Sequence, residues 1–257
     1  MARRNVRAPS ARRDQLLFTC EHAGNRIPRE HASRFRGAAA VLESHRGWDP
    51  GALPLARKLA RRFGLPLRFV TTSRLLVEAN RSPENPRIWS PYTAGLPPEE
   101  RQRVLDRYYW PHRRDVEATV RASTASGLRV VHVAVHSFTP RVDGEVRKGD
   151  VGLLYDPARP RERALALRWQ GILRGLDPTL RVRRNFPYRG VADGLATWLR
   201  RRFRDPDYAG FELEVNQAVF AGPRRRVIER ALGASLERLL EHRPQRVTGW
   251  SIWKSGS

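Results

Sequence analysis

The sequence predicts an α/β fold in which helices alternate with the strands of an open sheet. Short apolar segments rich in β-branched residues alternate with segments whose apolar residues recur at helical spacing. One segment, Arg129–Val135 (RVVHVAV), is almost wholly apolar, as expected of a central parallel strand buried on both faces, and His132 within it is expected to be a hydrogen-bonded core residue. The chain has 257 residues, 40% of them hydrophobic, which suits one large domain.

The N-terminal half begins with a short apolar strand and continues as alternating helix and strand. Its predicted elements are a strand at Leu16–Cys20, a helix from Asp49 to Phe63, strands at Leu67–Val70 and Ser73–Ala79, and a helix at Glu99–Arg121. The segment Asn80–Pro98 contains five prolines and is predicted to be a long loop, a candidate lid or substrate loop. Pro111 lacks a backbone donor, so it should kink or split the helix that contains it.

The C-terminal half continues the alternation. Its predicted elements are strands at Arg129–Val135, Val151–Tyr155, Leu180–Arg184 and Phe211–Val215, and helices at Glu162–Leu173, Gly194–Phe203 and Arg224–Glu241. Residues 1–13 are predicted to form a disordered basic arm, residues 14–245 a single catalytic domain and residues 246–257 a polar tail.

The formal net charge is +23 at pH 7, and almost all of the cations are arginines, because the only lysines are Lys58, Lys148 and Lys254. A strongly basic chain can bind nucleic acid by neutralising phosphates. The arginines are spread along every segment, however, and the sequence contains no nucleic-acid-binding motif. Weak, nonspecific polyanion binding is compatible with this charge. A basic nucleic-acid-binding protein with a vestigial site is therefore the alternative from a different functional class.

The sequence contains no long apolar segment that would predict a transmembrane helix, and no apolar stretch of signal-peptide length follows the basic N-terminus. The single cysteine, Cys20, excludes an internal disulfide framework and is typical of a reducing compartment. We therefore expect a cytoplasmic protein without a membrane partner; the oligomeric state stays open.

Four polar residues lie where a predicted strand ends or a predicted helix begins: His22, Asp49, His136 and Glu214. In an open α/β sheet these positions converge on one edge, and that edge is where ligands bind. Two histidines and a carboxylate can hold a zinc ion and leave one position open for water, and a further carboxylate can take a proton from that water. The four residues together suggest a zinc hydrolase.

Several of these candidates have an alternative interpretation. Asp49 is followed by proline, and aspartate as the N-cap with proline in the first turn is how many helices begin. Glu212 and Glu214 point the same way on one predicted strand, so either could be the base, although Glu214 is nearer the C-terminal end. Glu21 and His45 are reserve ligands that could replace Asp49.

Five motifs resemble those of the N-formylglutamate amidohydrolase family, in this order and at these intervals. They are CEHAGNRIP, RGWDPGA, SRLLVEANRS, VHSF and LEVNQ, and the resemblance extends from about Leu16 to Phe220. It implies a three-layer α/β/α sandwich of the phosphorylase/hydrolase-like type, with a mixed, mostly parallel sheet and a zinc site at the sheet edge. It also implies the roles in the site, with His22, Asp49 and His136 as metal ligands and Glu214 as the general base.

Further matches to the family imply substrate contacts. Asn80 and Arg81 resemble the asparagine–arginine pair with which zinc carboxypeptidases hold a terminal carboxylate, a group that a guanidinium fork binds well. Tyr188 and Arg189 match a family loop and are expected to contact the substrate. His112 lies in another family stretch and is expected either to face the site or to lie behind it or at the surface.

The sequence departs from the family pattern at two positions and lacks the usual Tyr-Met ending of the last motif. Glu78 stands where aspartate is expected, and Gln217 stands where arginine is expected. These departures bear on the substrate more than on the metal site. The resemblance implies hydrolysis of the amide of a small anionic N-formyl or N-acyl amino acid by a zinc-activated water. A cell-wall or peptide amidase that uses the same site is the alternative enzyme function.

Overall fold

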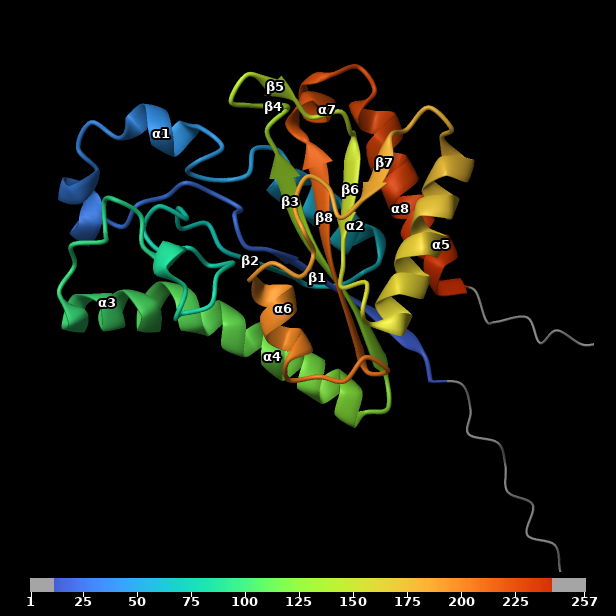
Figure 1. Cartoon of the computed structure of the whole chain (residues 1–257). Helices are drawn as coiled ribbons and strands as arrows, with labels where there is room; N and C mark the ends of the chain where they lie inside the picture. Colours follow the sequence, from blue (N-terminus) through green and yellow to red (C-terminus); the bar gives the residue numbers. More distant parts are fainter. Residues whose placement is uncertain (1–11, 242–257) are drawn as a thin grey trace, which may run out of the picture.

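The computed structural model describes residues 12–241, which form a six-stranded sheet between two layers of helices (Figure 1). In spatial order the strands are β2 (Leu67–Phe69), β1 (Asp14–Cys20), β3 (Arg129–Phe138), β8 (Tyr208–Asn216), β6 (Val151–Leu154) and β7 (Val182–Arg184). Neighbouring strands are parallel, except that β6 runs antiparallel to β8. The predicted α/β fold with a mixed, mostly parallel sheet is confirmed.

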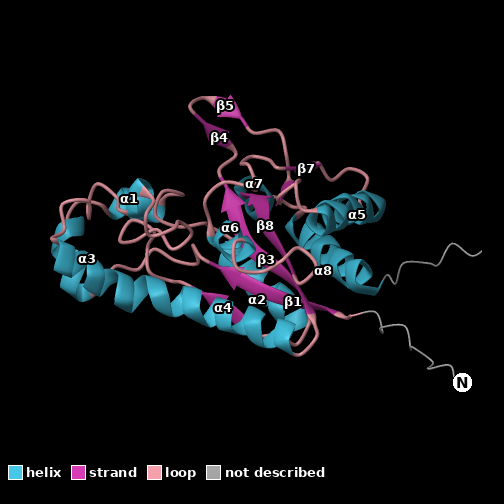
Figure 2. Cartoon of the chain, turned by 60° about the horizontal axis from the view of Figure 1, so that its bottom comes forward, coloured by secondary structure: helices cyan, strands magenta, loops and turns pink. Residues whose placement is uncertain are grey.

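Helices cover both faces of the sheet (Figure 2). One face carries α2 (Ala52–Arg62), α5 (Pro160–Leu176) and α8 (Arg225–Glu241), and the other carries α4 (Trp110–Ala125) and α6 (Leu195–Arg200). The three layers expected from the family resemblance are therefore present. The short elements are η1 (Arg29–Phe35), α1 (Ala39–Glu43), η2 (Pro86–Ile88), α3 (Pro98–Val104), β4 (Arg141–Val142), β5 (Glu145–Val146) and α7 (Gln217–Ala221).

The largest part of the core lies between the sheet and α2, α5 and α8. Trp169 of α5 is fully buried and packs edge-on against Phe211 of β8, with the ring centroids 5.7 Å apart. Its indole Nε1 donates a hydrogen bond of 2.8 Å to the hydroxyl of Ser235 in α8, which satisfies the polar end of the buried ring. This side chain joins two helices to the strand that carries Glu214.

The helix predicted at Glu99–Arg121 is continuous but changes type along its length. It consists of α3, a π-helical turn η3 (Leu105–Tyr109), and α4. The π turn lies immediately before Trp110 and Pro111. Because proline has no backbone N–H, the hydrogen-bond ladder is interrupted there in any case, and a π turn accommodates one extra residue at such a point. The effect expected of Pro111 is therefore seen as a change of helix type.

The strand predicted at Ser73–Ala79 is wrong, because this segment forms turns. The N–H of Leu76 donates to the carbonyl of Ser73 at 2.9 Å, and the N–H of Leu75 donates to the Ser73 hydroxyl at 3.2 Å. A serine side chain that bonds its own backbone in this way competes with the ladder of a sheet. The turn places Arg74 and Glu78 side by side at the sheet edge.

The predicted basic arm, residues 1–13, lies outside the described residues except for its last two. Of these, Arg12 donates hydrogen bonds to the carbonyls of Gly127 (2.9 Å) and Leu128 (2.7 Å), so the chain is held to the domain before β1 begins. The predicted tail, residues 246–257, also lies outside the described residues. Between residues 12 and 241, no helix is long and apolar enough to cross a membrane.

His132 is a buried, hydrogen-bonded core residue, as predicted. Its Nε2 lies 2.8 Å from the hydroxyl of Thr19 and its Nδ1 lies 2.8 Å from the hydroxyl of Tyr208. Both partners are neutral, so they do not offset the loss of hydration that a charged imidazole would suffer. Burial therefore lowers the pKa of His132 from 6.5 to about 4.

This pKa shift predicts a loss of stability in acid. Because the folded state binds the proton less readily than the unfolded state, the contribution of His132 is fully present above pH 6.5 and is lost as the pH falls towards 4. The loss attributable to this residue should approach about 3 kcal/mol. Denaturant unfolding of the wild type and His132→Gln across this range should give a shallower pH dependence for the variant. Equal slopes would contradict the assignment.

Candidate active site

The carboxyl ends of β1, β3 and β8 meet at one edge of the sheet. His22 follows β1, His136 lies near the end of β3, and Glu214 is the register partner of His136 on β8. Asp49 reaches the same edge from the segment before α2. All four side chains line one cavity of about 470 Å³. The parallel strands therefore bring the four candidate residues together.

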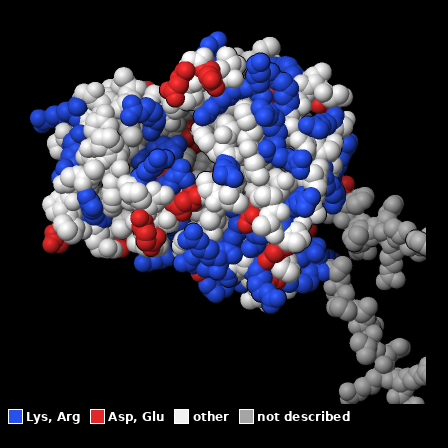
Figure 3. Space-filling model, viewed as in Figure 1, with Lys and Arg blue, Asp and Glu red and all other residues white. Residues whose placement is uncertain are grey.

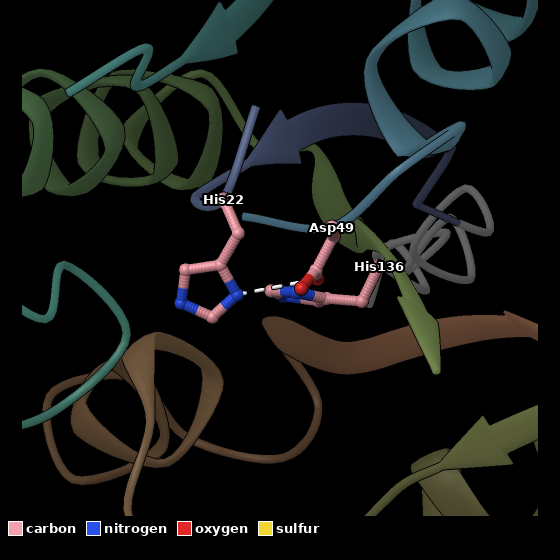
Figure 4. A group of neighbouring side chains, drawn as sticks. All are labelled: His22, Asp49 and His136. Atoms are coloured by element: carbon pink, nitrogen blue, oxygen red, sulfur yellow. Dashed lines mark hydrogen bonds and ion pairs between the residues drawn. The ribbon is translucent and has the colours of Figure 1, made fainter. Parts of the chain in front are cut away.

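His22, Asp49 and His136 point towards one another (Figure 4). Nδ1 of His22 and Nδ1 of His136 lie 3.2 Å and 2.9 Å from the same oxygen, Oδ2 of Asp49. One donor atom from each residue lies within 4.8 Å of the others, and all three residues are buried. Donor atoms of these types at this spacing could hold a metal ion.

The alternative in which Asp49 caps helix α2 is wrong. The N-cap of α2 is Gly51, whose φ of 84° is left-handed, and no side chain caps this helix. A Cβ atom at Gly51 would also lie 2.2 Å from the ring of Phe220, so the turn requires glycine. This turn leaves the Asp49 carboxylate free to face the histidines, while the Asp49 N–H donates to the carbonyl of His22 at 3.0 Å.

A second buried carboxylate stands behind each histidine. Glu78 and Nε2 of His22 form a short hydrogen bond. Oε2 of Glu21 lies 3.1 Å from Nε2 of His136, although the two groups are not aligned as a regular hydrogen bond. Partners of this kind hold a metal-binding imidazole in one orientation. Both Nδ1 atoms are thereby directed at the centre of the group.

Neither reserve ligand takes the place of Asp49. Glu21 lies on the far side of His136 from Asp49 and contacts the opposite ring nitrogen. His45 is exposed and contributes no donor atom to the group. His112 lies behind the site, with its Nε2 3.1 Å from Oε1 of Glu21. Of the roles expected for His112, the structure supports the one outside the cavity.

Arg74 is the principal cavity residue that the sequence did not indicate. Its Nε donates to Oε2 of Glu78 at 2.7 Å, and its Nη1 lies 3.5 Å from Oδ1 of Asp49. The guanidinium therefore links the carboxylate behind His22 to the carboxylate that faces both histidines. The signal in the sequence is the four-residue spacing of arginine and glutamate in SRLLVE, which brings two side chains together in a helical turn. The apolar residues of the same segment predict a strand, so the pair is not expected there.

These contacts determine which groups are charged. Burial alone would raise the pKa of Asp49 and of Glu78. The charge of His22 beside Asp49, and the charges of Arg74 and His22 beside Glu78, instead hold both pKa values well below their usual range. Burial alone would lower the pKa of His136, yet the hydrogen bond to Asp49 and the nearby carboxylate of Glu21 raise it well above its usual range. Ionised carboxylates therefore surround the two imidazoles, and the cation of Arg74 contacts two of these carboxylates.

Glu214 and Glu212 both line the cavity but differ in their contacts. Oε1 of Glu212 accepts a hydrogen bond of 3.0 Å from the amide of Asn80. Glu214 is 5% exposed, and within residues 12–241 its Oε2 has no hydrogen-bond partner. Burial raises the pKa of Glu214 to about 8, opposed by the charge of His136 and assisted by that of Asp49. Of these two carboxyl groups, Glu214 is thus the one with a buried oxygen that has no hydrogen-bond partner.

The four predicted substrate contacts, Asn80, Arg81, Tyr188 and Arg189, all line the cavity. The Asn80 amide is already engaged, because its Oδ1 accepts a 2.8 Å hydrogen bond from the first N–H of α6 and its Nδ2 donates to a carboxylate. Arg81 donates one hydrogen bond to the carbonyl of Asp193. Tyr188 and Arg189 are exposed at the surface. Asn80 therefore builds the wall of the cavity, whereas Arg81 and Arg189 bring cations to it.

Basic side chains are spread over the face of the molecule seen in Figure 3, with acidic side chains among them. This distribution agrees with a sequence in which arginines occur along every segment. Some arginines are used inside the fold: Arg159 and Arg200 both contact the fully buried Glu162, at 3.2 Å and 3.0 Å. The basic charge of this face is therefore not gathered over a single element.

Known proteins resemble this chain in sequence and in fold. The model of the N-formylglutamate amidohydrolase family matches residues 14–221. The solved structure of a gene product of Agrobacterium tumefaciens is 30% identical over 87% of this chain and 91% of that chain, with a TM-score of 0.72. An N-formylglutamate amidohydrolase from Ralstonia eutropha shares the fold, with 20% identity over 91% of this chain and 95% of that chain and a TM-score of 0.64. No curated protein matches the sequence.

Proposed function

The chain belongs to the N-formylglutamate amidohydrolase family, and on that premise we propose that it is a zinc-dependent enzyme that hydrolyses the amide of an N-formyl or N-acyl amino acid. The family supports a hydrolase that acts on carbon–nitrogen bonds other than peptide bonds. The observation that carries the proposal is the group of buried donor atoms from His22, Asp49 and His136 at the cavity.

The donor set fits zinc. Two imidazole nitrogens and one carboxylate oxygen are ligand types that zinc accepts, and three protein ligands leave a position for the reaction. Because a carboxylate faces Nε2 of both His22 and His136, each Nδ1 can direct its lone pair at the ion. When bound, zinc polarises the scissile carbonyl and lowers the pKa of a water molecule towards about 7.

Glu214 is the proposed general base. Its buried, unengaged oxygen can accept a proton from the attacking water and deliver it to the leaving nitrogen. Burial raises the pKa of this carboxyl group to about 8, close to the pH range in which such a proton must be both taken and returned. Glu212 is less suited to this role because the Asn80 amide already occupies one of its oxygens.

Arg81 and Arg189 are proposed to hold the carboxylate of the substrate. A guanidinium carries several N–H donors in a planar fork that matches a carboxylate. Arg81 uses one of them on the carbonyl of Asp193 and keeps others for a ligand. Asn80 and Tyr188 shape the cavity around these two cations. The arrangement favours a small anionic substrate.

Metal content tests the proposal directly. We expect purified wild-type protein, reconstituted with zinc and dialysed, to retain about one zinc per chain by elemental analysis. His136→Ala should retain little zinc and still unfold cooperatively, because it removes one ligand from a site at the rim of the core. His45→Ala is the matched control, since this histidine is exposed and outside the group, and it should bind zinc like the wild type. A wild-type protein without stoichiometric zinc after reconstitution would defeat the proposal.

The substrate class is tested with N-formyl-L-glutamate, other N-acyl amino acids and a cell-wall peptide amide as parallel substrates. We propose the highest kcat/KM for the N-acyl amino acids, because Arg81 and Arg189 line the cavity and can hold the carboxylate of such a substrate. Preferential cleavage of the cell-wall amide would contradict the proposed substrate class and leave the proposed zinc site intact.

A further inference from the structure

Glu21 is a fully buried carboxylate that lies between two histidines. Its Oε2 is 3.1 Å from Nε2 of His136, and its Oε1 is 3.1 Å from Nε2 of His112. A buried carboxylate is costly unless cations or hydrogen-bond donors face it. Each oxygen of Glu21 therefore faces one imidazole, and the three side chains form a chain of contacts from His112 through Glu21 to His136.

His112 belongs to α4, and it does not line the active-site cavity. It lines a separate cavity of about 760 Å³ beside β2, and its side chain is 7% exposed. Glu21 does not line the active-site cavity either. Neither residue lines the cavity, and the side-chain contact that joins them to the site is the one between Glu21 and His136.

We propose that Glu21 and His112 are positioning residues that fix the orientation of His136 and thereby set the affinity of the site for zinc. This role rests on the proposed function, because it takes His136 to be a ligand. A free imidazole can rotate, and its proton can occupy either nitrogen. A carboxylate at Nε2 keeps the proton there, leaves the Nδ1 lone pair for the metal and makes the imidazole a stronger ligand.

His112 acts on this arrangement through Glu21. Without it, Oε1 of Glu21 would be buried with no partner, and the carboxylate would be free to turn away from His136. The carboxylate on the opposite side of the group, Glu78, is held by the permanent cation Arg74 at 2.7 Å. Glu21, the carboxylate that faces His136, is instead held by the imidazole of His112 on α4.

The test measures zinc affinity by titrating the metal-free, full-length protein against a chromogenic chelator. We expect Glu21→Gln to weaken zinc binding by about 10–100-fold, because glutamine keeps the shape and loses the charge. His112→Leu should weaken it by about tenfold, at the lower end of that range. His112→Gln, whose amide can still donate to Glu21, should stay within about threefold of the wild type.

Glu212→Gln is the matched control, because it also neutralises a carboxylate at this edge but its hydrogen-bond partner is Asn80 and not a histidine. Its zinc affinity should equal that of the wild type. The absorption spectrum of the cobalt(II)-loaded proteins provides a second readout of ligand geometry. It should change in Glu21→Gln and His112→Leu and stay unchanged in His112→Gln.

Melting of the metal-free proteins shows which variants fold. If Glu21→Gln does not fold, the comparison of His112→Leu with His112→Gln decides the question. Folded Glu21→Gln and His112→Leu that bind zinc as tightly as the wild type would overturn the positioning role and leave the zinc enzyme standing. A wild type that binds no zinc is a different result, because it removes the proposed function itself.

Discussion

Replacing Glu214 with glutamine is expected to lower kcat by about 10²–10⁴-fold and to leave bound zinc in place. Glutamine preserves the volume of the side chain but cannot accept a proton at its amide. The Oε2 atom of Glu214 has no protein partner within the described residues, so the substitution breaks no hydrogen bond that holds the fold. Steady-state kinetics with N-formyl-L-glutamate, together with elemental analysis of the same preparations, measures both quantities.

Glu212→Gln separates the base from its neighbour. Its carboxylate already accepts a hydrogen bond from Asn80, so we expect a smaller loss of kcat than for Glu214→Gln. A fully active Glu214→Gln, or a larger loss in Glu212→Gln, would reverse the assignment of the base. Loss of zinc from Glu214→Gln would instead indicate that Glu214 is a ligand.

Replacing Arg200 with methionine is expected to lower the free energy of unfolding by about 3–5 kcal/mol. Arg200 is 6% exposed, and its Nε lies 3.0 Å from Oε1 of Glu162, a carboxylate that is fully buried. It also donates to the carbonyls of Gly190 at 2.6 Å and Gly210 at 2.7 Å. Methionine fills similar space but leaves the carboxylate and both carbonyls without this donor.

Arg201→Met is the control for the loss of one arginine from the same helix end. Arg201 is exposed, so its replacement should change the free energy of unfolding by no more than about 0.5 kcal/mol. Urea unfolding of the three proteins at one pH measures the difference. Equal stabilities of Arg200→Met and Arg201→Met would show that Arg159 compensates for the missing charge at Glu162.

The sequence predicted the order and type of the long elements because their periodicities are distinct. Arg129–Val135 is apolar at nearly every position, and β3 is buried along almost its whole length. The direction of β6 was not predictable, since a buried strand has the same pattern whether its neighbour is parallel or antiparallel. At Ser73–Ala79 the apolar residues favoured a strand, but local hydrogen bonds of Ser73 produced turns.

The candidate site was predictable where it depends on the ends of strands. His22, His136 and Glu214 come to one edge because parallel strands place their carboxyl ends there. Asp49 was ambiguous, because the same residue could cap a helix, and the left-handed turn at Gly51 that excludes capping has no unique sequence signature. The contact of His112 with a carboxylate 91 residues away could not be read from spacing along the chain.

The π-helical turn between α3 and α4 has a consequence for how this site tolerates changes in length. An α-helix advances by about 100° per residue, and a π turn takes up one residue more than an α-helical turn. Removing one residue from Leu105–Tyr109 should therefore turn this segment into plain α-helix and keep the later side chains of α4 in place. His112 would still face Glu21, and the buried Arg113 would keep the carbonyl of Arg81, to which it donates at 2.6 Å. A deletion within α4 before His112 has no such turn to absorb it, so it would rotate both side chains away from the candidate site and from the Asn80–Pro98 loop.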